Sequence, residues 1–99
     1  MKGYYVQPQD VCYPKNHVKA VKVLVDKGQE DFSVASLMWD DKPRIGIRWN
    51  GTDNHTGTPQ SRGRPTWFIL PTEIALAYAH QIGGTKVEQE WKIRLAHGI

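Results

Sequence analysis

The chain has little cysteine and no long apolar run, and we expect no secretory signal at its start. Its single cysteine, Cys12, excludes a disulfide bond within the chain, and a lone cysteine fits a reducing compartment, so we expect a cytoplasmic protein. No apolar run approaches the roughly 20 residues that a membrane-spanning helix needs. The first ten residues lack the apolar stretch of a signal peptide. We therefore expect no membrane partner.

The common catalytic and cofactor-binding patterns are also missing. The spacings typical of zinc sites are absent, as are G-x-x-x-x-G-K-[ST], G-x-G-x-x-G and the G-x-S-x-G frame around Ser61. Asp53 and His55 lie two residues apart, and such a pair acts as a base or binds a metal where the side chains meet in a cleft. We expect no metal, no cofactor and no catalytic residue, and we keep an enzyme built on this pair as a minor alternative.

Composition indicates one ordinary folded domain. The 99 residues suggest a single domain spanning 1–99. Hydrophobic residues make up 39% and charged residues 23%, which excludes an intrinsically disordered chain.

Alternating apolar residues predict most of the secondary structure. Ile45, Ile47 and Trp49 alternate with Arg44, Gly46 and Arg48, which predicts a strand whose arginines point away from the core. Valine-rich or alternating segments predict strands at 17–25, 32–39, 44–49 and 86–95, and a short apolar run predicts one at 66–70. The apolar residues of 86–95 also fit a helical stripe, and its unbroken charged side makes us prefer the strand.

One helix is expected after the last central strand. Thr72 suits the N-cap, and Ile74, Tyr78 and Ile82 recur at the spacing of one helical face. The glycine pair 83–84 ends this helix. The fold class is therefore α+β: a meander-like antiparallel sheet of four to five strands with one amphipathic helix packed on it.

A polar segment between two tryptophans carries most of the candidate site. Residues 50–65 form a sixteen-residue stretch with almost no apolar content, and loops of this length are either functional or disordered. Between Trp49 and Trp67, and on the strand before them, arginines are concentrated. The charged residues of 44–67 are Arg44, Arg48, Arg62, Arg64 and Asp53, a net charge of +3 that equals the charge of the whole chain.

These arginines suit an anion, because a guanidinium forms forked bonds to phosphate and stacks on aromatic rings. Backbone N–H groups around Gly63, with Ser61, are able to cradle an oxyanion. Gly46 leaves a bare patch of backbone for a close-lying ring or ligand. The candidate binding residues are Arg48, Trp49, Asn50, Ser61, Arg62, Arg64 and Trp67. In the alternative interpretation the arginines only keep a strand edge soluble, and the two tryptophans pin the ends of the loop instead of flooring a pocket.

Two segments resemble a pattern found in small bacterial proteins of no established activity. GIRWNG spans Gly46–Gly51, and PQSRGRPTWFILP spans Pro59–Pro71. With the residues between them, the two segments span 46–71, about a quarter of the chain. The pattern implies an ancestral module and assigns no catalytic residue, substrate or cofactor.

Two functions remain. The first is a non-enzymatic binding module that presents the arginine- and tryptophan-rich loop to an anionic ligand, with nucleic acid as the best candidate. The second is a self-associating interaction module, a homodimer formed through strand edges or the aromatic face, with no role in nucleic-acid binding.

Overall fold

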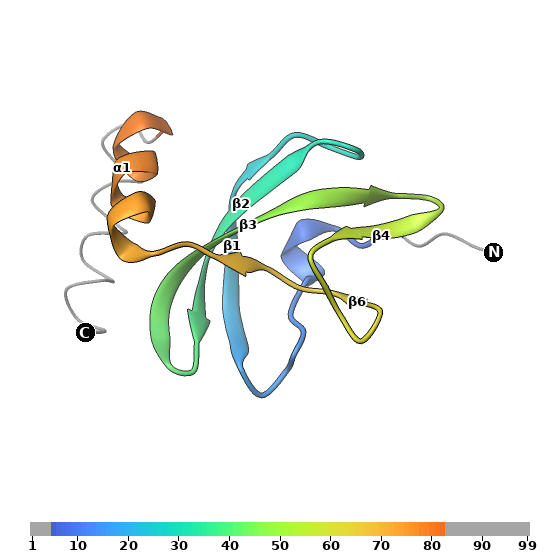
Figure 1. The fold of residues 1–99 in the computed structure, drawn as a ribbon, viewed down its shortest axis with the longest axis horizontal. Helices are drawn as coiled ribbons and strands as arrows, with labels where there is room; N and C mark the ends of the chain where they lie inside the picture. The colour runs from blue at the N-terminus through green and yellow to red at the C-terminus, as the bar shows by residue number, and fades with distance from the viewer. Residues whose placement is uncertain (1–4, 83–99) are drawn as a thin grey trace.

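The computed structural model describes residues 5–82 and shows an antiparallel sheet with a helix at one end (Figure 1). The strands of this sheet are β1 (Val18–Asp26), β2 (Phe32–Trp39), β3 (Lys42–Thr52), β4 (His55–Thr58) and β7 (Phe68–Ile69). The sheet order is β1-β2-β3-β4, and β7 pairs with β3 beside β4. A short 3-10 helix, η1 (Pro8–Asp10), precedes these strands, and α1 (Thr72–Ile82) follows them. The predicted α+β class, with four to five antiparallel strands and one helix, is confirmed.

The β2–β3 hairpin is the centre of the sheet. Its register runs from Phe32 opposite Trp49 to Trp39 opposite Lys42. Asp40 and Asp41 form the turn with positive φ values of 51° and 66°, the backbone of the two-residue turns that match strand twist. β2 has the bounds that alternation predicts, whereas β3 extends beyond 44–49 at both ends.

Residues 50–65 do not form a single loop, and that prediction is wrong. β3 continues into this segment and pairs with β4, and β5 (Gln60–Ser61) pairs with β6 (Arg64–Pro65) in a separate two-stranded hairpin. The chain folds back so tightly that a Cβ on Gly51 would lie 2.1 Å from the carbonyl oxygen of His55. Backbone pairing creates these strands, so the sequence lacks the apolar alternation that would have predicted them.

Helix α1 lies near the predicted position and contributes Ala75 to the core. Ala75 is buried and packs with Val34 of β2 and Ile45 of β3. No helix among residues 5–82 has the length and apolarity to span a bilayer. The strand predicted at 86–95 lies outside the described residues.

The sheet has apolar side chains on both faces. We call one the closed face: its buried cluster is Val11, Val18, Ala35, Leu37 and Trp67. We call the other the groove face: its buried cluster is Val34, Ile45 and Ala75, with Phe32, Ile47, Leu70 and Tyr78 partly buried around it. Arg44, Gly46 and Arg48 alternate with Ile45 and Ile47, so they belong to the closed face. The prediction that the arginines point away from the core is therefore wrong for Arg48.

Candidate functional site

Arg48 is an internal clamp. Only 3% of the residue is exposed. Its Nη1 donates to the carbonyl oxygens of Thr66 and Pro59, and its Nη2 donates to that of Thr56. Thr56 and Pro59 belong to the segment 50–65 predicted as a loop, and Thr66 is the first residue after it, so one guanidinium ties that segment to the sheet. The prediction that Arg48 is presented to a partner is wrong, because its donors are already used inside the protein.

Arg48 is buried and forms no ion pair with a carboxylate among the described residues, and this changes the pKa of its guanidinium. Desolvation lowers the pKa of Arg48 to about 10, and the nearby Tyr5 opposes this shift. Carbonyl dipoles stabilise the charge in place of an acidic partner. Gly57 makes the contact possible, since a Cβ there would lie 2.7 Å from Nη2 of Arg48 and 2.2 Å from the oxygen of Trp49. Its φ of 87° also favours glycine.

Asn50 is a second buried polar residue that joins the strands. Its Nδ2 donates to the carbonyl oxygen of Gly28 at 2.7 Å, and its Oδ1 accepts from Ser33 Oγ at 2.8 Å. These bonds connect β3 to β2 and to the turn after β1. Asn50 therefore has its strongest contacts within the protein, and we no longer include it in the candidate binding surface.

Trp67 fills the gap above Gly46. The residue is 3% exposed, and its Nε1 donates to the oxygen of Val11 at 2.7 Å. A Cβ on Gly46 would lie 2.8 Å from the Cβ of Trp67. The bare backbone patch therefore accepts a ring, as the sequence suggested, and that ring belongs to the chain itself. Trp67 pins the end of the polar segment and does not line a ligand site.

Trp49 lies on the opposite face and is 59% exposed. It lines an apolar groove of about 530 Å³ between the sheet and α1. The groove is lined by Phe32, Val34, Ile47, Arg48, Trp49, Thr58, Phe68, Leu70, Ile74 and Tyr78. The two tryptophans that bracket the polar segment therefore lie on different faces and do not floor one pocket.

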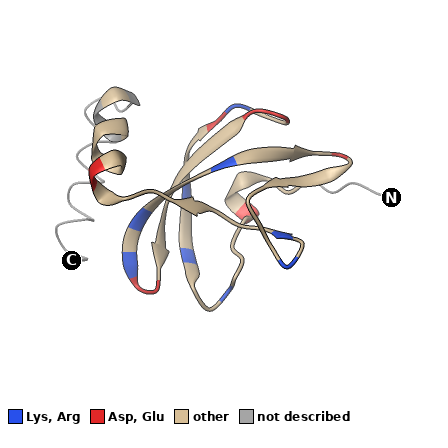
Figure 2. Ribbon diagram, in the orientation of Figure 1, with Lys and Arg blue, Asp and Glu red and all other residues tan. Residues whose placement is uncertain are grey.

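The tip of the β5–β6 hairpin is the exposed basic feature. Arg62 and Gly63 have φ values of 52° and 79°, which is the two-residue turn that fits strand twist. Arg62, Gly63 and Arg64 are exposed, and Ser61 is partly buried. Figure 2 shows basic residues at this tip and no acidic one. Neither arginine forms an ion pair with another residue of the 5–82 range.

An aromatic ring lies under one of these arginines. The guanidinium carbon of Arg64 is 5.3 Å from the ring centroid of Tyr13, within cation–π range. A shallow depression of about 360 Å³ lies beside this pair. Its lining is Val6, Asp10, Cys12, Tyr13, Lys15, Thr56, Gly63, Arg64 and Pro65. The hairpin tip and the depression beside it therefore bring together the guanidinium groups of Arg62 and Arg64, the ammonium of Lys15 and the ring of Tyr13, and the lining includes one acidic residue, Asp10.

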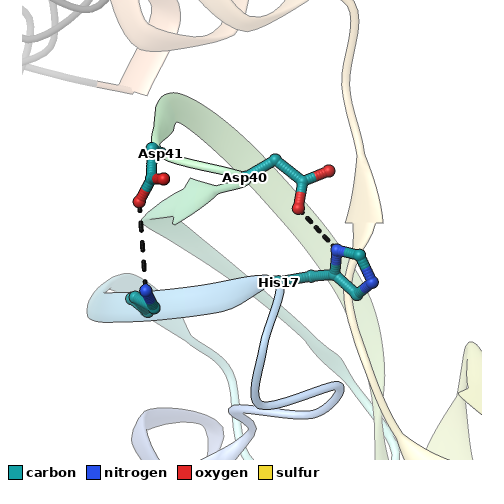
Figure 3. Close-up of polar contacts among 4 residues, drawn as sticks. His17, Asp40 and Asp41 are labelled. Atoms are coloured by element: carbon teal, nitrogen blue, oxygen red, sulfur yellow. Dashed lines mark hydrogen bonds and ion pairs between the residues drawn. The ribbon is translucent and has the colours of Figure 1, made fainter.

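A histidine–carboxylate pair was missed by the sequence analysis. His17 Nδ1 and Asp40 Oδ1 form a hydrogen bond at the start of β1, and Lys19 Nζ lies 3.9 Å from Asp41 Oδ1 (Figure 3). The His17 ring stacks on Trp39 with centroids 5.5 Å apart. The amide of Asp40 also donates to the oxygen of His17 at 2.9 Å. These contacts fasten the β2–β3 turn to β1, and the pair has a structural explanation.

The pair Asp53 and His55 gives no support to the enzyme alternative. Both residues are exposed, and His55 Nδ1 accepts from the amide of Gly57 at 3.1 Å. No group of three histidine, cysteine or acidic residues suited to a metal occurs in the described part of the chain. Cys12 is a poor nucleophile, because burial and the nearby Asp10 raise the pKa of its thiol.

Comparisons of the chain with known protein families, with curated proteins and with solved structures found no match. The resemblance of Gly46–Gly51 and Pro59–Pro71 to small bacterial proteins therefore stays a prediction. The structure gives those two segments a common physical role: Arg48 and Gly46 in the first contact Pro59, Thr66 and Trp67 in the second.

Proposed function

We propose that the protein is a non-enzymatic binding module whose β5–β6 hairpin binds an anionic partner, with single-stranded nucleic acid as the best candidate. The observation that carries this proposal is the tip itself: Arg62 and Arg64 are exposed and without an ion pair among the described residues. An arginine that lacks an internal acceptor keeps its forked donors for an external phosphate.

The neighbouring side chains favour nucleic acid over a lone small anion. Tyr13 lies under Arg64, and Lys15 lines the same depression. Single-strand binding combines cations along the backbone with rings on which bases stack. Arg48 supports this function indirectly, because its bonds to Thr56, Pro59 and Thr66 hold the hairpin against the sheet. A pre-positioned hairpin loses less conformational entropy on binding.

Fluorescence anisotropy with a labelled single-stranded oligonucleotide tests the proposal. At low salt the parent protein is expected to bind, and R62A/R64A to bind at least tenfold more weakly. Each phosphate contact to a single strand contributes about 0.7 to the slope of log K against log salt, so the double substitution is expected to reduce that slope by about 1.4. The matched control is K27A/K42A, which removes two exposed positive charges elsewhere.

The outcomes distinguish contacts made by the hairpin tip from attraction by the protein's overall positive charge. Equal weakening in R62A/R64A and K27A/K42A would mean that net charge alone attracts the oligonucleotide. No binding by the parent protein at low salt would remove nucleic acid as the partner. A tyrosine test adds detail: Tyr13→Leu is expected to weaken binding several-fold and to leave the salt slope unchanged, because stacking is lost and no charge is removed.

A further inference from the structure

The depression beside the hairpin tip brings together two segments that lie far apart in the sequence. Asp10 is the last residue of η1, Arg64 is the first residue of β6, and both line the depression, so the two elements lie side by side (Figure 1). Tyr13 and Lys15 line it as well. Its volume of about 360 Å³ is at the lower end of the roughly 300–1,000 Å³ that ligand pockets occupy, which suits one flat base.

Asp10 is the acidic residue of this basic surface. It is exposed, and its carboxylate forms no ion pair with a residue of the 5–82 range. Burial and the charge of Asp10 raise the pKa of the Cys12 thiol, and Lys15 opposes this rise, so both charges lie close to the same sulfur atom in the depression. An ionised carboxylate only accepts hydrogen bonds. A ligand in the depression therefore meets Asp10 with a donor group.

Among the bases, guanine is the best match for a group that only accepts hydrogen bonds. Its Watson–Crick edge carries two neighbouring donors, the N1–H group and the N2 amino group, which suit the two oxygens of one carboxylate. Adenine and cytosine carry one amino group next to a ring acceptor, and thymine carries one N–H group between two carbonyl oxygens. A single strand leaves these edges unpaired, so a protein reads them directly. A carboxylate placed among cations and a ring therefore favours guanine over the other bases.

We propose that the depression receives one base of the bound strand and that Asp10 makes it selective for guanine. This inference rests on the proposed function, because it assigns a base preference to the same surface. The stacked pair of Arg64 and Tyr13 supplies a plane for the base, and Asp10 accepts from its two donors. Arg62 and Lys15 remain for the flanking phosphates. The charge of Asp10 also repels phosphate, so it lowers the affinity for every strand while it raises the selectivity for guanine.

Fluorescence anisotropy of the unmodified protein with three labelled strands tests the base preference. Each is a short thymine strand whose central base is guanine, hypoxanthine or thymine, and hypoxanthine keeps the N1–H group of guanine but lacks its amino group. At low salt the guanine strand is expected to bind about fivefold or more tightly than the other two. Equal affinity for all three would overturn the inference and leave the proposed function standing. Binding to none of them would overturn both.

Two matched variants assign the preference to one carboxylate. Asp10→Asn and the control Asp53→Asn each remove one exposed negative charge. Asp10→Asn is expected to bring the affinities for the guanine and hypoxanthine strands within about twofold of each other, because the charge-assisted bonds are lost. Asp53→Asn is expected to raise both affinities and to keep their ratio, because it changes only the general attraction. Loss of the preference in both variants or in neither, with both folded by circular dichroism, would contradict the role of Asp10.

Discussion

The two faces of the sheet bury their apolar side chains to different extents. On the closed face, Val11 and Trp67 pack with Ala35 and Leu37, which are fully buried. On the groove face, α1 contributes Ala75 to a smaller cluster, and Trp49 and Phe68 stay more than half exposed. The difference shows that, within residues 5–82, the closed face is covered and the groove face keeps large apolar side chains exposed. It also shows that alternation along β3 does not distinguish core from surface here.

The largest expected difference between the faces comes from the two tryptophans. Trp67→Ala removes a buried ring and is expected to cost about 3–5 kcal/mol of unfolding free energy. Trp67→Phe keeps most of the volume and loses the hydrogen bond to Val11 O, so about 1–2 kcal/mol is expected. Trp49→Ala is expected to cost less than Trp67→Ala. Urea denaturation followed by circular dichroism measures all three, and an equal loss for Trp49→Ala and Trp67→Ala would erase the distinction.

Arg48 and Arg44 form the next pair. Arg48→Ala leaves three carbonyl groups without their donor, and a loss of about 3 kcal/mol is expected. Arg44→Ala is expected to cost less than about 1 kcal/mol, because its Nη1 has one long bond of 3.3 Å to Thr72 Oγ1. Arg48→Lys keeps the charge without the forked donors and is expected to fall near Arg48→Ala. Equal stability of the two alanine variants in urea would contradict the clamp.

Gly46 tests how closely the closed face is packed. Gly46→Ala places a Cβ 2.8 Å from Trp67 Cβ and 3.2 Å from a Leu37 methyl group. Trp67 Cβ is fixed next to the backbone and Leu37 is fully buried, so neither neighbour moves cheaply. We expect a loss of about 1–3 kcal/mol by thermal denaturation. In Gly46→Ala/Trp67→Ala the second substitution provides space, so the combined loss is expected to be smaller than the sum of the single losses. If the two losses of unfolding free energy simply add, a methyl group at position 46 does not clash with Trp67.

The raised pKa of Tyr78, on the groove face, predicts a modest loss of unfolding free energy at alkaline pH. Burial raises the pKa of its hydroxyl above the ordinary value near 10. The unfolded chain therefore ionises first as pH rises past about 10, the folded state holds more protons, and unfolding free energy falls with increasing pH. Tyr78→Phe is expected to make this alkaline loss shallower in urea titrations between pH 9 and 11. An unaltered pH dependence in Tyr78→Phe would contradict the burial.

The smallest expected effect belongs to the hairpin tip. R62A/R64A is expected to change unfolding free energy by less than about 0.5 kcal/mol, since both side chains are exposed. A much larger loss in the same urea assay would show that these arginines stabilise the fold and are not reserved for a partner. This result also decides whether weaker oligonucleotide binding by the variant reflects lost contacts or lost structure.

Alternation and helix signals predicted the framework well. Strand β2 has the predicted bounds, and α1 begins at Thr72, one residue earlier than an N-cap at Thr72 predicts. Both elements carry their information in neighbouring residues, so a local pattern suffices. The bare backbone at Gly46 was also a usable signal, although the ring that fills it comes from Trp67, 21 positions further along the chain.

The candidate site was harder to predict, because its contacts are not local and involve the main chain. Arg48 bonds to carbonyl groups 8 to 18 residues away, which no side-chain pattern encodes. β4 has the sequence HTGT and pairs through its backbone, so it looked like a loop. Asp40 meets His17 across 23 positions. Arg62 and Arg64 are exposed, as expected for a polar segment, but the two-residue turn that carries them was not predicted.

An NMR titration of the full chain with a short single-stranded oligonucleotide tests most directly whether Arg48 acts inside the protein while Arg62 and Arg64 contact the partner. Backbone amide shifts are expected to change, with saturation, at Ser61, Arg62, Gly63 and Arg64, and to stay constant at Arg48 and Trp67. Shifts centred on Trp49 and Phe68, or equal shifts at Arg48 and Arg62, would contradict an internal clamp that holds an external basic tip.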